Sequence, residues 1–192
     1  MNKWRGEIDV PLTELGLSGA IYLGSQLEEK ERKLALVYHD WLSRSADTAK
    51  AICPLTSMSR YGCRPWRMGP AFEGNPITPE SIRHAQWFAE NMHEQPNGGE
   101  PFGNWYTEWM GWLNNLSDVT HEPMGVVTHN RNIQAVYSTV EGKFVPELYN
   151  AVGPDFLSVH EYKHRRIVPW DGGVLAKGAV YIIRHGETSF GT

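Results

Sequence analysis

Short apolar runs of strand type alternate with helix-like segments along most of this chain. Runs at 34–38, 124–128 and 179–183 are rich in Val, Ile, Leu and Tyr, and segments with helical spacing lie between them. Parallel neighbouring strands need a long crossover connection, which is usually a helix. The alternation therefore predicts an α/β protein: a three-layer α/β/α sandwich with a mainly parallel central sheet.

The helix signals are caps and apolar spacing. Thr13 and Thr78 are suitable N-caps, and Pro79 suits the first position of a helix. A hairpin is expected from strands at 157–162 and 173–175, whereas 53–78, rich in Pro and Gly, indicates a loop. Helices are expected at 12–34, 45–52, 79–93, 102–116 and 130–139. The cluster of Trp105, Trp109 and Trp112 indicates either a packed helix face or an aromatic pocket wall.

Composition bounds the class of protein. The 192 residues suit one domain, taken here as 1–192, with a core of its own. A net charge of −4 gives no general attraction to nucleic acid or an anionic membrane. No apolar run approaches the ~20 residues of a membrane span, and the first residues lack a signal-peptide pattern. With only Cys53 and Cys63, reduced thiols and a cytoplasmic location are expected, although one disulfide stays open.

Cationic or imidazole side chains follow each of the three apolar runs. Arg44 lies soon after the first, His129 directly after the second, and Arg184 and His185 after the third. Ligands of open α/β sheets bind at the carboxyl ends of the strands. We therefore expect these four side chains to meet in one anion-binding site.

The last twelve residues carry the strongest motif. They read YIIRHGETSFGT, and joining them to the first residues gives YIIRHGETSFGT-MNKWRGEIDVPLTELG. The joined text resembles the continuous opening of the histidine phosphatase superfamily, which includes cofactor-dependent phosphoglycerate mutases. In that family the Arg-His-Gly motif follows the first strand of the domain. The resemblance implies a phosphoglycerate mutase-like fold that is circularly permuted, with its ends in the loop after the catalytic histidine.

Two further segments resemble the same family. Residues 38–49, YHDWLSRSADTA, are similar to its S-x-L-x-R-A-x-x-T-A element, and 126–130, VVTHN, to its V-V-x-H element. The resemblance implies that His185 is a nucleophile that forms a phosphohistidine. It implies that Arg184 and Arg44 clamp the phosphoryl group, that His129 donates to its oxygens, and that Gly186 lets backbone approach a phosphate.

The chain departs from the family in the segment that supplies a general acid. Residues 64–74 read RPWRMGPAFEG and have no carboxylate at the family's place, so Glu73 is the nearest acid; catalytic and structural roles both stay open. The family's Asn falls by spacing on Gly191, and Asn2 lies a few residues on. Arg5 replaces a Gln or Thr and is either a phosphate ligand, a grip for a second anionic group, or a surface residue.

The leading hypothesis is a metal-independent phosphatase that needs no cofactor and acts on a small phosphorylated substrate. An absent acid favours good leaving groups, such as acyl phosphates, phosphoanhydrides and phosphoramidates. The alternatives are a mutase-like phosphotransferase and a pseudoenzyme that binds a phosphorylated ligand without turnover. A metal site of His39, His129 and His185 lacks carboxylate or Cys partners at ligand spacing. The terminal strand also leaves open a homo-oligomer in which it docks on a neighbouring copy.

Overall fold

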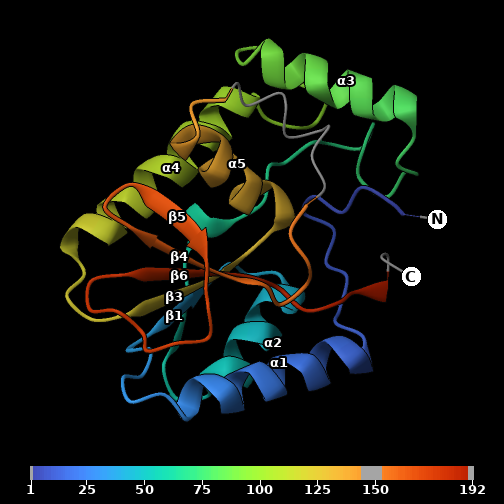
Figure 1. The fold of residues 1–192 in the computed structure, drawn as a ribbon. Helices are drawn as coiled ribbons and strands as arrows, with labels where there is room; N and C mark the ends of the chain where they lie inside the picture. The colour runs from blue at the N-terminus through green and yellow to red at the C-terminus, as the bar shows by residue number, and fades with distance from the viewer. Residues whose placement is uncertain (1, 144–152, 190–192) are drawn as a thin grey trace.

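A six-stranded sheet in the order β2-β1-β3-β6-β4-β5 forms the centre of the molecule (Figure 1). A computed structural model describes residues 2–143 and 153–189. Four strands run parallel, and β4 and β5 extend the sheet as antiparallel neighbours of β6. The strands are β1 Val37–His39, β2 Ser57–Ser59, β3 Met124–Thr128, β4 Val159–Lys163, β5 Arg166–Pro169 and β6 Val180–Arg184.

Helices cover both faces of this sheet (Figure 1). α1 (Glu14–Glu28) and α2 (Ser43–Ile52) pack together on one face, and α4 (Phe102–Val119) and α5 (Asn130–Val140) lie on the other. α3 (Pro79–Glu90) contacts α4, and a short 3-10 helix, η1 (Tyr61–Cys63), connects β2 to the loop beyond it. The three-layer α/β/α architecture with a mainly parallel sheet is therefore confirmed.

Two apolar cores sandwich the sheet because successive side chains of a strand point to opposite faces. Val126 of β3 and Ile182 of β6 join the core under α4 and α5. Their neighbours Val127 and Ile183 join the core under α1 and α2. All four are fully buried, as expected for central parallel strands, which hold β3 and β6 firmly in register.

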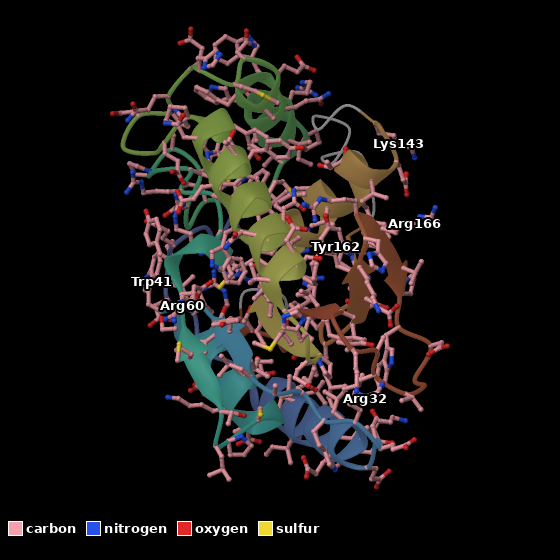
Figure 2. All side chains as sticks on the ribbon, turned by 90° about the vertical axis from the view of Figure 1, so that its left-hand side faces the viewer. Arg32, Trp41, Arg60, Lys143, Tyr162 and Arg166 are labelled. Atoms are coloured by element: carbon pink, nitrogen blue, oxygen red, sulfur yellow. The ribbon has the colours of Figure 1, made fainter. Side chains whose placement is uncertain are left out.

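The tryptophans of α4 form a packed helix face. Trp105 and Trp109 are almost fully buried, and the indole N–H of Trp109 donates to the carbonyl of Asn132 in α5 at 2.9 Å. Tyr162 of β4 lies under the same helix (Figure 2), and its hydroxyl donates to the Oδ1 of Asn114 at 2.6 Å. Of the two interpretations of this cluster, the packed helix face is the one observed.

Most element boundaries agree with the sequence, but the strand expected at 34–38 is observed as β1, at Val37–His39. The hydroxyl of Thr13 accepts from the N–H of Gly16, and Thr78 forms a capping box with Ser81, so both caps are confirmed. α1 ends at Glu28 rather than near residue 34. None of the helices in the described part of the chain combines the length and apolar character needed to cross a membrane. The two cysteines are free.

Two strand expectations were wrong. The loop expected at 53–78 contains β2, which forms by pairing with β1 rather than through any apolar pattern of its own. The partner of β4 in the hairpin is β5, and 173–175 is not a strand. The hairpin turn places His164 and Arg165 at φ 52° and 59°, the left-handed region that two-residue hairpin turns require. Without an Asn-Gly or Asp-Gly pair, that turn has no local signature.

Candidate active site

One pocket opens at the carboxyl ends of the parallel strands. Five of the residues singled out in the sequence line it together: Arg5, Arg44, His129, Arg184 and His185. The rest of its described lining consists of Lys3, Trp4, Gly6, Pro65, Trp66, Met68, Ile77, Asn130 and Arg131. The expectation that strand-end cations and imidazoles meet is confirmed, because β3 ends at Thr128 and β6 ends at Arg184 in adjacent register.

His185 is held in one tautomer. Its Nδ1 lies 2.7 Å from the carbonyl oxygen of Gly186, and the side chain is buried. A carbonyl oxygen only accepts, so Nδ1 must carry the proton in this contact. The lone pair of a neutral imidazole then lies on Nε2, the nitrogen that no described side chain engages.

The surroundings of His185 keep it neutral. Burial lowers its pKa well below the ordinary histidine value, and the nearby His129 and Arg44 lower it further. A neutral imidazole with a free lone pair is the form that attacks phosphorus. At neutral pH the site thus holds a nucleophile that needs no separate base to deprotonate it.

His129 stands beside His185, with 5.2 Å between the ring centroids. Its Nε2 contacts the carboxylate of Asp40, and the hydroxyl of Ser45 lies 3.4 Å from the same nitrogen. Asp40 was not singled out in the sequence. The sequence signal that could have identified Asp40 was its position directly after β1, where the family element has Ser.

Arg44 is almost wholly buried and ties the N-terminal segment to the site. Its two terminal nitrogens donate to the carbonyls of Ile8 at 2.6 Å and Gly6 at 2.7 Å. Its Nε is buried without a hydrogen-bond partner in the described residues. Desolvation lowers its pKa to about 10, so the group stays cationic at neutral pH. Arg44, which lines the pocket, therefore keeps one buried donor unsatisfied.

Arg184 has a similar unpaired donor. One terminal nitrogen bonds to the carbonyl of Pro154, and its guanidinium carbon lies 4.0 Å from the centroid of the Phe156 ring. Its Nε is buried and lacks a partner within residues 2–143 and 153–189. Burial, then repulsion by Arg5, lowers its pKa to about 10. Phe156, which also contacts His185, had no recognisable sequence signal.

Two expected site residues are not among the described lining residues. Glu73 does not line the pocket; its Oε1 accepts from the backbone N–H groups of Met68 at 3.0 Å and Gly69 at 3.4 Å. These contacts give Glu73 a structural place in the loop. Asn2 is exposed and outside the lining, with its carbonyl accepting from the N–H of Ile77.

Gly186 allows a close approach to the backbone of Gly16, whereas the sequence led us to expect a close approach to a phosphate. A Cβ at this position would lie 2.7 Å from the carbonyl oxygen of Gly16, at the start of α1. Its N–H donates to the hydroxyl of Thr48 at 3.0 Å rather than lying free for a phosphate. The glycine therefore lets the segment after β6 pack against α1 and α2.

The segment after β6 also runs beside the N-terminal segment. Thr188 pairs with Leu12 in an isolated bridge, and the Nε of Arg5 donates to the hydroxyl of Thr188 at 2.8 Å. The Thr13 N–H donates to the carbonyl of Glu187 at 3.0 Å. Figure 1 shows the first and last described segments on the same side of the molecule.

A family model, the histidine phosphatase superfamily (branch 1), matches residues 1–168. The chain belongs to this family. This membership confirms the predicted enzyme class, a metal-independent phosphatase. The matched range ends before Arg184 and His185, so the family assignment rests on the rest of the chain. The search of curated proteins gave no significant match.

Solved structures of similar fold support the same architecture. A mycobacterial glucosyl-3-phosphoglycerate phosphatase in complex with inorganic phosphate aligns with TM-score 0.67 and 19% identity over 89% of this chain and 92% of that one. The alpha-ribazole phosphatase from Shigella flexneri gives TM-score 0.68 and 16% identity, covering 91% of each chain. YhfR from Bacillus stearothermophilus gives 0.64 and 24%, over 92% of this chain and 87% of that one. At these identities the likeness establishes the fold alone.

Proposed function

We propose that the chain hydrolyses a small phosphorylated compound through a phosphohistidine on Nε2 of His185. The observation that carries this proposal is the contact from Nδ1 of His185 to the carbonyl of Gly186. It fixes the proton on Nδ1 and leaves Nε2 as a lone-pair nucleophile inside a cationic pocket. Substrate binding then needs only to bring phosphorus in line with that lone pair.

The unpaired donors supply the phosphoryl site. The Nε–H groups of Arg44 and Arg184 have no described partner, which supports assigning them to phosphoryl oxygens, whose charge they would stabilise during transfer. The Nε2 lone pair of His185 forms the P–N bond while the P–O bond to the leaving group breaks, and that oxygen keeps the bonding electrons. Water then attacks phosphorus, the P–N electrons return to Nε2, and inorganic phosphate leaves.

The charge of the lining narrows the substrate class. Arg5, Arg44 and Arg184 line the pocket, and none of the described lining residues is acidic. A phosphoryl dianion balances only two of these three cations. We therefore propose a substrate with a second anionic group, held on the side of the pocket that carries Arg5.

Because no acidic residue is among the described lining residues, the substrate's leaving group must depart without a proton from the lining. One oxygen of Glu73 accepts two backbone N–H groups, and the described lining residues include no carboxylate that would protonate a departing alkoxide. Leaving groups of low basicity need no such proton. We propose that acyl phosphates and phosphoanhydrides, and phosphoramidates whose nitrogen is already protonated, react faster than simple alkyl phosphates.

We also propose that the domain is circularly permuted. β6 occupies a central place in the sheet, between β3 and β4, although it comes last in the described chain. The contacts of Thr188 with Leu12 and Arg5 place the two segments side by side, as a continuous parent chain would. The cytoplasmic location, the single domain over 1–192, and the absence of nucleic-acid and membrane partners stay predictions.

The test is intact mass after brief mixing with an aryl phosphate, quenched in alkali to preserve phosphohistidine. An aryl leaving group needs little help from an acid, so the missing carboxylate does not mask the reaction. We expect a phosphoryl adduct in the wild type and none in His185→Ala. Wild-type protein that neither forms an adduct nor releases phosphate would favour a binding scaffold instead.

A further inference from the structure

Asp40 is a buried carboxylate that the proposed mechanism does not yet use. Its side chain has no solvent exposure. One oxygen accepts the N–H of Leu42 at 2.8 Å, and the other contacts Nε2 of His129. A buried carboxylate needs compensating donors or positive charge, because burial alone strongly disfavours the ionised form. His129 is the titratable group that directly contacts it.

The contact fixes the tautomer of His129. An ionised carboxylate only accepts hydrogen bonds, so Nε2 of His129 must carry a proton. In the neutral ring Nδ1 is then a bare lone pair, and within the described residues it has no hydrogen-bond partner. Such a lone pair repels a phosphoryl oxygen. His129 can donate from Nδ1 only as the imidazolium.

Burial and the neighbouring arginines disfavour the imidazolium of His129. Burial of His129 lowers its pKa; Asp40 raises it, and Arg44 of α2 and Arg184 of β6 lower it. His185 faces the same ring from the end of β6. A dianion bound between these groups cancels the repulsion from the two arginines and adds attraction on the Nδ1 side.

Two other titratable groups border Asp40. The thiol of Cys63 has its pKa raised by burial and by Asp40, so it stays protonated and uncharged. The Nδ1 of His39 lies 2.6 Å from the backbone carbonyl of Asp40, and its ring is thus engaged with the main chain rather than the carboxylate. Neither group competes with His129 for the carboxylate oxygens.

We infer that Asp40 is a positioning residue that makes binding of a phosphoryl dianion proton-coupled. The proton comes from solvent, enters Nδ1 of His129 as the dianion binds, and stays there during transfer as a donor to a phosphoryl oxygen. This inference rests on the proposed phosphate site, in which His129 donates from Nδ1 to a phosphoryl oxygen. The inference depends on Asp40, which stands where the similar family element has a serine.

The serine of the family element suggests a matched substitution, Asp40→Ser, and Asp40→Asn is a second one. In Asp40→Ser and Asp40→Asn the residue at position 40 can donate to Nε2 of His129. The neutral ring then carries its proton on Nδ1 and donates to the anion without taking up a proton. These variants keep a polar partner for His129, so they separate the charge of Asp40 from a merely structural contact.

The experiment is calorimetric titration with sulfate in buffers of different ionisation enthalpy, at about pH 7.5, one unit above the ordinary histidine pKa. Sulfate mimics the phosphoryl dianion and does not titrate in this range, so any proton uptake belongs to the protein. We expect uptake approaching one proton per sulfate in the wild type. Asp40→Ser and Asp40→Asn should bind sulfate with little or no uptake.

His185→Ala identifies the group that takes the proton. Uptake equal to the wild type supports His129, and lost uptake assigns the proton to His185 and overturns the inference. Sulfate binding without uptake in the wild type, uptake unchanged in both Asp40 variants, or no sulfate binding would also overturn it. If one Asp40 variant no longer unfolds cooperatively, and so is not properly folded, proton uptake is measured with the other variant.

The outcome is independent of the proposed hydrolysis. A wild type that takes up a proton with sulfate but forms no phosphoryl adduct refutes the hydrolase and leaves the role of Asp40 standing. An adduct on His185 without proton-coupled sulfate binding refutes only the role of Asp40.

Discussion

Replacing His185 by Gln should flatten the acid dependence of stability. Burial, with His129 and Arg44, lowers the pKa of His185 in the folded protein, whereas the unfolded chain binds a proton near the ordinary value of ~6.5. Because the folded pKa is the lower one, this imidazole destabilises the fold as pH falls below ~6.5, until the folded pKa is reached. One unmatched proton corresponds to a slope of about 1.4 kcal/mol per pH unit.

The wild type carries two such groups in the site, since burial also lowers the pKa of His129. The free energy of unfolding should therefore fall by at most about 2.7 kcal/mol per pH unit at pH values below ~6.5 and above both folded pKa values. His185→Gln should lose roughly half of that slope. Urea unfolding at several pH values measures it, and His121→Gln, which replaces an exposed histidine, is the control. Equal slopes in the wild type and His185→Gln would refute a neutral, buried nucleophile.

Three further predictions concern other positions. Glu73→Gln should retain most aryl phosphatase activity, because Gln keeps an acceptor for the loop N–H groups. A loss of activity of about 100-fold would instead indicate that Glu73 is the general acid. Trp109→Ala should lower the free energy of unfolding by about 3–5 kcal/mol in chemical denaturation, since the indole is wholly buried; a change under ~1 kcal/mol would contradict the packing. Thr48→Val leaves the Gly186 N–H without its acceptor and should cost about 1–3 kcal/mol of stability and reduce kcat, while unchanged values of both would show that the contact is dispensable.

The sheet and the meeting of the strand-end residues followed from the sequence because both depend on strong, local signals. β3 was predicted at its observed bounds, since an apolar run of that length is buried on both faces wherever a central strand forms. His129 and His185 could be placed together because parallel strands present their carboxyl ends at one edge. The family motifs then indicated which nitrogen-bearing side chains matter.

The rest depended on tertiary contacts that have no sequence signature. β2 is Ser-Met-Ser, and it becomes a strand only because β1 offers an unpaired edge. The role of Asp40 could not be predicted because it depends on contact with His129, which follows β3 and is distant in the chain. The interpretation of Gly186 was wrong for a similar reason: the neighbour that excludes a side chain there is Gly16, distant in the chain.

The measurement that tests the central claim most directly is the identity of the phosphorylated nitrogen. Nitrogen-15 labelled protein, phosphorylated by an aryl phosphate and observed by NMR, distinguishes the two positions on the His185 ring. Because Nδ1 donates to the Gly186 carbonyl, the phosphoryl group should be found on Nε2. A phosphoryl group on Nδ1 of His185, or on another residue, would contradict the account.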